Sequence, residues 1–278
     1  MKAFPALVVV LLSAVGCHGK ARERSKARES EGGSTLVVTI VYDNNPFDER
    51  LRAAWGFACV VEGLSETVLF DTGGDGGILL ANMAKAGFKP GQIDSVVLSH
   101  IHGDHTGGLE ALLRANSGVK VFVPRAFPSR FKEGIRRSGA QVVETDEPCQ
   151  VCEGAWTTGV LTRGIAEQGL YPETADGPVV ITGCAHPGIV RLVEAARRHA
   201  KEPVYAVLGG FHMGGASARE IATVIQSLRK AGVRQVAPCH CSGDRTRSLM
   251  KRAFGEEYLP SGVGARLVFG SPEPEEEP

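Results

Sequence analysis

The sequence predicts a single α/β domain in which sheets are flanked by helices, and three observations favour this fold class. The chain has 278 residues, which is enough to bury a sizeable core. Short apolar runs alternate with helical patterns along most of its length. Several strand-like runs come in succession before the first helical pattern. This opening argues against a purely doubly wound parallel sheet, so the alternation indicates an α/β sandwich.

The first half begins with strands, because its short runs are apolar and rich in β-branched residues. Strands are expected at 35–42, 57–62, 67–71, 95–99 and 120–124. Helical spacing predicts helices over 77–87 and 106–115, the first of them closed by Gly87. A less regular middle follows, with strand-like pieces around 141–144 and 156–163.

The second half repeats the alternation of strand and helix. Strands are expected at 178–182, 204–210, 233–238 and 265–269. Amphipathic spacing predicts helices over 188–200 and 217–232. We therefore expect residues 36–270 to form one folded domain.

The N-terminal segment has the proportions of a signal peptide. Lys2 precedes the run "FPALVVVLLSAVG", which is shorter than the roughly 20 residues that span a bilayer. The ending "SAVGC" resembles a bacterial lipobox, which implies that Cys17 becomes the acylated first mature residue. Residues 1–17 are then a lipoprotein-type signal peptide, 18–35 a flexible charged tether and 271–278 an acidic tail rich in proline. The alternative is that the apolar run is the buried start of the first domain.

These segments predict an exported protein that is anchored by lipid in the bacterial periplasm or cell envelope. Membrane contact is expected only through Cys17. Lysine and arginine number 31, as do aspartate and glutamate, so no strong net charge attracts nucleic acid. We expect a small-molecule substrate and no nucleic-acid partner, and the sequence indicates no particular oligomeric state.

The cysteines other than Cys17 number six, which permits disulfides in an oxidising compartment. "CQVC" places Cys149 and Cys152 three positions apart. They could form a disulfide, a surface redox pair or two free thiols, and the disulfide is favoured.

The densest polar cluster is "SHIHGDHTGG" at 99–108, directly after an apolar strand. His100 and His102 are two positions apart, so an extended chain points both side chains to the same side. A turn then brings Asp104 and His105 around. Neutral imidazole and carboxylate suit zinc and related metals, and these groups would be costly to bury without a cation. The cluster therefore predicts a metal centre, and the alternative is a solvated polar turn.

Three further histidines follow predicted strands instead of lying inside them. His186 follows 178–182, His212 follows 204–210, and His240 follows 233–238. Functional residues concentrate in the loops at strand ends. We therefore expect these imidazoles to meet His100 at one edge of the sheets.

The motif "SHIHGDHTGGL" matches the signature of the metallo-β-lactamase-fold superfamily, and the resemblance runs from about Val37 to Phe269. "LFDTGGDG", "TGCAHPGIV", "LGGFHM" and "APCHCSGD" resemble its other motifs. With "VYDNNPF", the chain is most similar to the branch called dihydropterin-ribofuranosyl-aminobenzene-phosphate synthase-like. The resemblance implies a four-layer αβ/βα sandwich in a single domain. It also implies one or two divalent metal ions between the sheets, with zinc first and manganese or iron as alternatives.

The resemblance implies a ligand set when its motifs are carried over by position. One metal would be held by His100, His102 and His186, and the second by Asp104, His105 and His240. Asp71 would lie behind the ligands and orient an imidazole. Asp43 and Asn44 would line the substrate mouth or form an Asx turn.

One departure from the superfamily pattern concerns the strand at 204–210. Many relatives place a metal-bridging aspartate after it, but here the strand ends in "LGGFH". An imidazole has one lone pair, so His212 could hardly bridge two metals. His212 is expected to be a terminal ligand, a substrate-facing group or a buried structural histidine. Cys184 and Cys239 lie beside ligand positions, and packing as small apolar residues is favoured for both.

The function implied by the resemblance is metal-dependent hydrolysis of an ester, lactone, thioester or phosphoester of a small molecule. A bound cation lowers the pKa of water to about 7 and so supplies hydroxide at neutral pH. Asp104 would ligate metal and orient the attacking water, and His212 is the second candidate catalytic residue. The alternatives are a pterin-related phosphate synthase-like enzyme and a non-catalytic zinc-binding protein.

Overall fold

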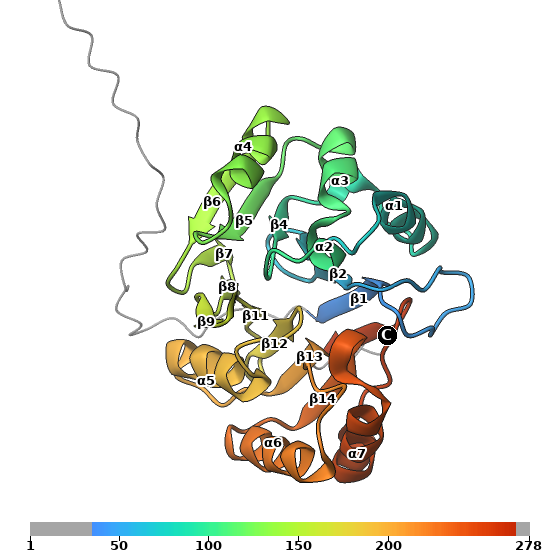
Figure 1. Cartoon of the computed structure of the whole chain (residues 1–278), viewed down its shortest axis with the longest axis vertical. Coiled ribbons are helices and arrows are strands. Elements are labelled where there is room, and N and C mark those ends of the chain that lie inside the picture. Colours follow the sequence, from blue (N-terminus) through green and yellow to red (C-terminus); the bar gives the residue numbers. More distant parts are fainter. Residues whose placement is uncertain (1–34, 271–278) are drawn as a thin grey trace, which may run out of the picture.

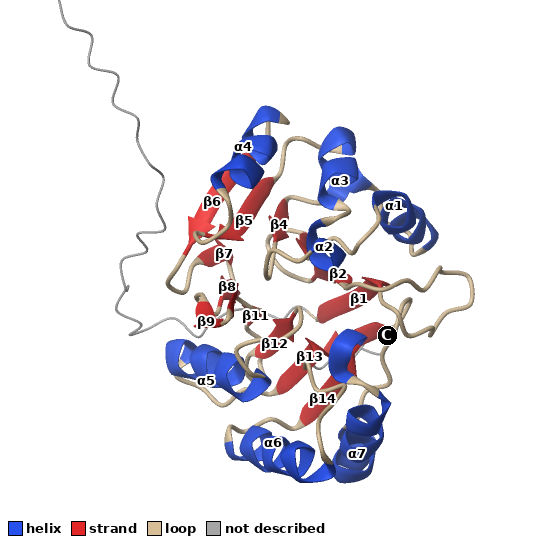
Figure 2. Cartoon of the chain, viewed as in Figure 1, coloured by secondary structure: helices blue, strands red, loops and turns tan. Residues whose placement is uncertain are grey.

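The structure is a computed structural model that describes residues 35–270 (Figure 1). The predicted signal peptide and acidic tail, and all but the last residue of the tether, lie outside the described residues. Two sheets lie face to face, with helices on their outer sides (Figure 2). Within residues 35–270, no helix is both long enough and apolar enough to cross a membrane.

The first sheet has seven strands in the order β15-β1-β2-β3-β4-β5-β6. Its strands are β1 (Leu36–Tyr42), β2 (Ala58–Glu62), β3 (Val68–Phe70), β4 (Ser95–Val97), β5 (Lys120–Pro124), β6 (Gln141–Thr145) and β15 (Arg266–Phe269). Strands β15, β1, β2 and β3 pair antiparallel, whereas β3 to β6 pair parallel. The mixed pairing agrees with the succession of strands that opens the sequence.

The second sheet has six strands in the order β14-β13-β12-β11-β8-β7, and a separate two-stranded sheet pairs β9 with β10. These strands are β7 (Gln150–Cys152), β8 (Ala155–Thr157), β9 (Leu161–Arg163), β10 (Ile165–Glu167), β11 (Leu170–Pro172), β12 (Val179–Thr182), β13 (Ala206–Gly210) and β14 (Gln235–Cys239). Strands β12, β13 and β14 pair parallel. Their carboxyl ends therefore lie at one edge of this sheet.

Helices α1, α3 and α4 cover the first sheet, and α5, α6 and α7 cover the second (Figure 1). The helices are α1 (Gly76–Lys85), α2 (Gly103–Thr106), α3 (Leu109–Ala115), α4 (Ser129–Arg137), α5 (Ile189–Ala200), α6 (Ala218–Lys230) and α7 (Asp244–Phe254). Short 3₁₀ turns span Pro90–Gln92, His240–Ser242 and Gly255–Glu257. Local sequence fixes several boundaries. The Ser217 hydroxyl, for example, accepts a hydrogen bond from the Glu220 N–H and begins α6 with a capping box.

Three apolar clusters fill the three interfaces between four layers. One holds residues of both sheets, such as Phe70 and Leu208. A second joins the first sheet to its helices, and the third joins the second sheet to α5, α6 and α7. The fold is the predicted four-layer αβ/βα sandwich, because each sheet buries one face against the other sheet and one against helices.

The structure corrects three details of the prediction. The helix expected over 106–115 is divided into α2 and α3 at Gly107 and Gly108. A Cβ at either glycine would lie 2.3 Å or less from a carbonyl oxygen of the 72–74 loop, so α2 packs closer to that loop than a continuous helix with side chains allows. The piece expected over 156–163 divides into β8 and β9. The favoured Cys149–Cys152 disulfide is wrong, because Cys152 carries a free, buried thiol.

Candidate metal centre

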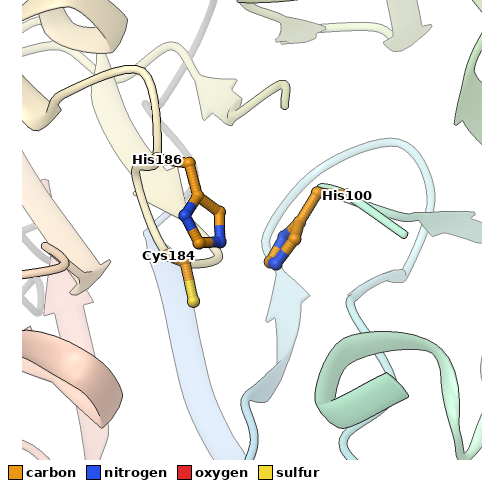
Figure 3. A group of neighbouring side chains, drawn as sticks. All are labelled: His100, Cys184 and His186. Carbon is orange, nitrogen blue, oxygen red and sulfur yellow. The ribbon is translucent and has the colours of Figure 1, made fainter. Parts of the chain in front are cut away.

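The predicted histidines converge because parallel strands end at the same edge of each sheet. In the first sheet, Asp71 follows β3, and Ser99 and His100 follow β4. In the second sheet, the segments after β12, β13 and β14 carry His186, His212 and His240. Figure 3 shows His100 turned toward Cys184 and His186, which come from the opposite sheet. The two edges therefore face each other with polar side chains between them.

The first donor group consists of three imidazoles. His100 Nε2 lies 3.1 Å from His102 Nδ1. The ring of His186 lies 4.8 Å from that of His100 and 4.9 Å from that of His102, centroid to centroid. His186 Nε2 is buried and has no hydrogen-bond partner. A buried polar atom without a partner is costly, so this nitrogen fits the role of a metal ligand.

The second donor group consists of one carboxylate and two imidazoles. Asp104 Oδ2 lies 3.5 Å from His105 Nε2 and 3.4 Å from His240 Nε2. His240 Nε2 is also buried without a hydrogen bond. Tetrahedral zinc separates two nitrogen or oxygen ligands by about 3.3 Å, given bonds of about 2.0–2.1 Å. The His100–His102, Asp104–His105 and Asp104–His240 separations of 3.1, 3.5 and 3.4 Å are near this value, so these donor atoms fit a small divalent cation.

Hydrogen bonds to the outer ring nitrogens leave Nε2 of His100 and His105 free for a metal. Asp71 is fully buried and accepts from His105 Nδ1 at 2.7 Å. It also accepts from the hydroxyl of Ser99 at 2.7 Å, and this Ser99 oxygen lies 2.8 Å from His100 Nδ1. Since the Ser99 proton is committed to Asp71, His100 Nδ1 must be the donor to Ser99. Both imidazoles therefore present the lone pair of Nε2 to the centre.

His240 is oriented in the same way by Asn44 and Asp43. The Asn44 amide donates to the His240 carbonyl at 3.2 Å, so its oxygen faces His240 Nδ1 at 2.9 Å. Asp43 is fully buried and accepts from the His240 N–H at 3.0 Å and from the Asn45 N–H at 2.6 Å. The bond to Asn45 is the Asx turn. Asp43 thus lies behind His240 and does not face a substrate mouth.

Glu167, the last residue of β10, supports the site and was not anticipated from the sequence. It is fully buried, and its carboxylate accepts the backbone N–H groups of Cys184, Ala185 and His186 at 2.7–2.9 Å. The next residue, Gln168, bonds through its N–H to Ser99 O and through its amide to Leu98 O. Residues 167–168 therefore hold both edges of the site together. No motif marks this segment, which lies in the irregular middle of the chain.

His212 lies at the border of the site. Its side chain is exposed, and its ring centroid lies 4.3 Å from that of His186. Its sulfur-containing neighbours are Cys184 and Cys241, whose Sγ atoms lie within 4.8 Å of a His212 ring nitrogen. His212 is therefore placed beside His186 and the two thiols, outside the two donor groups.

Backbone strain concentrates around the centre. Five non-glycine residues of the described chain have positive φ. Four of them lie at this edge, namely Asp71, Ala185, His212 and His240, with φ between 48° and 61°. Such conformations cost free energy and persist where the surrounding structure imposes them, which is typical of functional sites.

The electrostatics of the site favour neutral imidazoles at His100 and His186. Burial lowers the pKa of His100 well below its usual range, and the neighbouring histidines lower it further. Burial, followed by His212 and His102, lowers the pKa of His186 to about 4. Neutral imidazole is the form that ligates a metal.

The second donor group has charged partners. Burial works against a charged His105, but the Asp71 carboxylate outweighs it and raises the pKa of His105. Burial would raise the pKa of Asp104, but His240 and His105 lower it overall, so Asp104 is ionised. The donor set thus combines imidazoles with one carboxylate, which suits zinc and related metals.

The fold and this donor set define a metallo-β-lactamase-type protein. The model of the metallo-beta-lactamase superfamily matches residues 56–218, more than half of the chain, so the chain belongs to this superfamily. A curated protein of Methanocaldococcus jannaschii, named 7,8-dihydropterin-6-methyl-4-(beta-D-ribofuranosyl)-aminobenzene-5'-phosphate synthase, is 27% identical over 282 residues. The match covers 84% of this chain and 96% of that protein, as the predicted resemblance to this branch implies.

Solved structures show the same architecture. Tm1679, described as a metal-dependent hydrolase of the beta-lactamase superfamily, has a TM-score of 0.68 and 25% identity, over 84% of this chain and 98% of its own. The short form of human tRNase Z has a TM-score of 0.58 at 14% identity, over 83% of this chain and 98% of its own. The second likeness shows the fold alone.

Proposed function

We propose that the chain is a metal-dependent hydrolase that acts on an ester, lactone, thioester or phosphoester of a small molecule. The observation that carries the proposal is the meeting of two donor groups at facing sheet edges, each with a buried imidazole nitrogen that lacks a partner. A bound divalent cation supplies a Lewis acid and lowers the pKa of a coordinated water. Zinc is the first choice on the donor chemistry.

The chain's own residues divide the remaining work. His100, His102 and His186 would hold one cation, and Asp104, His105 and His240 the other. The Asp104 side chain is 22% exposed while the His105 and His240 side chains are buried, so one face of its carboxylate is open to a reacting water. We assign to Asp104 the orientation of that water and to exposed His212 a contact with substrate.

Trp55 provides an aromatic surface at the border of the site. Its side chain is 60% exposed, and its ring centroid lies 4.9 Å from that of His240. An exposed tryptophan beside a ligand offers a flat apolar face to a substrate ring or acyl chain. We assign substrate binding, not chemistry, to Trp55.

A second candidate is a pterin-related phosphate synthase-like activity. Its support is the synthase of Methanocaldococcus jannaschii, which aligns over nearly its whole length with this chain. The predicted signal peptide argues against it, because pterin precursors are made inside the cell whereas this chain is proposed to be exported. A cell-envelope location is tested by labelling with a palmitate analogue. Equal labelling of the native chain and Cys17→Ser would contradict the anchor.

Metal analysis and an activity panel test the proposed function. Purified protein should contain about one or two divalent metal ions per chain, with zinc expected first. It should hydrolyse at least one member of a panel of lactone, thioester, carboxylic ester and phosphodiester probes, and His102→Ala and His105→Ala should abolish the hydrolysis. Glu133→Gln, on the exposed face of α4, serves as the control. A metal content near zero would contradict the proposal, and metal without turnover on any probe would favour a zinc-binding protein.

A further inference from the structure

We propose that the Cys184 thiolate bridges the two metal positions. The inference rests on the proposed function, since it requires a divalent centre. Cys184 follows β12 and is 4% exposed. Its sulfur forms one close group with donor atoms of His100 and His186, and another with donor atoms of His105 and His240. In each group all atoms lie within 4.8 Å of one another, so a single sulfur lies close to two imidazoles of each donor group.

The shortest contact of this sulfur identifies where a cation would bind. Cys184 Sγ lies 3.3 Å from His105 Nε2. Since His105 Nδ1 donates to Asp71, Nε2 is the ring nitrogen left to face the sulfur. A tetrahedral cation with bonds of about 2.3 Å to sulfur and about 2.0 Å to nitrogen separates these atoms by about 3.6 Å. On metal binding the thiol proton passes to solvent and the cation takes its place between sulfur and nitrogen.

Charge provides an independent argument. Of the six histidine and aspartate donors, only Asp104 is anionic, whereas two divalent cations bring four positive charges. The nearby carboxylates of Asp71 and Glu167 are committed to N–H and O–H donors. Uncompensated charge is costly in a buried site. A thiolate adds a second anion and, unlike imidazole, has several lone pairs with which to contact two cations.

The end of β13 has no side chain that could occupy the bridging position proposed for Cys184. Gly209 and Gly210 carry no side chain, and a Cβ on Gly210 would lie 2.3 Å from Gly183 O and 2.8 Å from Cys241 Sγ. A carboxylate at position 210 is therefore excluded by space. The Cys184 N–H, in contrast, is fixed by Glu167 at 2.9 Å. The structure thus provides a positioned sulfur where β13 has no room for an oxygen donor.

Cobalt titration tests the bridge. Metal-free protein is titrated with Co²⁺ alone, and the near-ultraviolet sulfur-to-cobalt charge-transfer band is followed. A bridging thiolate gives a band that grows over both equivalents, and the two Co²⁺ ions become magnetically coupled, so the electron paramagnetic resonance signal falls at the second. Cys184→Ser should lose the band and the tight second equivalent. Cys152→Ser, which removes a thiol remote from the centre, should keep the band and the tight second equivalent. Cys241→Ser, which removes the thiol next to Cys184, should keep them too.

Each outcome separates the bridge from the function on which it rests. Failure of the native protein to bind cobalt contradicts the proposed function, and with it the bridge. Two results overturn the bridge and leave the proposed function standing. One is cobalt binding without a charge-transfer band, and the other is a band that is lost in Cys241→Ser but kept in Cys184→Ser. A band complete after one equivalent overturns it too, since that shows a terminal thiolate. If Cys184→Ser does not fold, zinc-edge X-ray absorption of the native protein decides, because the bridge requires sulfur in the shell of both ions.

Discussion

Glu167 offers the sharpest test of how the site is built, because it touches no metal position and yet fixes the loop that supplies His186. The change is Glu167→Gln, which keeps the shape of the side chain. In the native chain one carboxylate oxygen accepts from the Cys184 and Ala185 N–H groups and the other from the His186 N–H. In the variant one of the two oxygens becomes an NH₂ donor, which cannot accept.

The magnitude follows from these hydrogen bonds. The glutamine oxygen is expected to keep the two bonds to Cys184 and Ala185, so the His186 N–H loses its acceptor. An unsatisfied buried donor costs roughly 1–3 kcal/mol. Removal of the buried charge offsets part of this cost, since burial, although opposed by the three N–H groups, raises the pKa of Glu167. A loss of about 1–2 kcal/mol localised at a ligand loop corresponds to roughly a 5- to 30-fold loss of zinc affinity.

The assay is competition for zinc between metal-free protein and a chromophoric chelator, run beside urea denaturation of the metal-free form. Glu133→Gln is the matched control, because it replaces a carboxylate by an amide in the same way, but on the exposed face of α4. The control should bind zinc like the native chain. Zinc affinity of Glu167→Gln within twofold of the native value would refute the argument that this carboxylate fixes the ligand loop.

Four other changes have expected outcomes. Asp71→Asn should weaken the rise of zinc affinity above about pH 6.5, because Asp71 raises the pKa of His105 and zinc must displace that proton; proton release measured calorimetrically in two buffers checks this. Gly183→Ala should cost about 1–3 kcal/mol in urea denaturation, since its Cβ would lie 2.1 Å from Ser99 Oγ. Trp55→Ala should raise KM roughly 3- to 10-fold and leave kcat and stability nearly unchanged, as steady-state kinetics and thermal melts will show. Chelation should lower the melting temperature, and zinc at about 100 times its Kd should restore about 2.7 kcal/mol.

The sequence predicted the architecture well wherever periodicity was regular. The strands at 120–124 and 178–182 and the helix at 188–200 lie within a residue of their observed bounds. Apolar runs of this length have few alternatives once helices alternate with them. The helix over 106–115 failed because its break depends on how closely α2 approaches the 72–74 loop, which is a tertiary contact. The α4 and α7 helices were missed because polar and basic residues obscure their short buried faces.

The imidazoles of the site could be anticipated, but their supports could not. His100, His186 and His240 each follow a strand, so parallel pairing suffices to bring them to one edge. Glu167 follows a short strand in an irregular segment, and only the path of the chain shows that its carboxylate faces the 184–186 backbone. The favoured disulfide failed for the same reason, since spacing alone does not state where two thiols point.

The arrangement of donors has a physical consequence for the whole sandwich. One sheet supplies His100, His102, Asp104 and His105, and the other supplies Cys184, His186 and His240. Donor atoms of several imidazoles lie close together across the two edges, and two buried imidazole nitrogens have no hydrogen-bond partner. The apolar cluster between the sheets and the bonds of residues 167–168 hold the donors there despite this cost. Because the edges are already held at ligand separations, metal binding gains affinity from preorganisation, and a change that loosens either edge should weaken it.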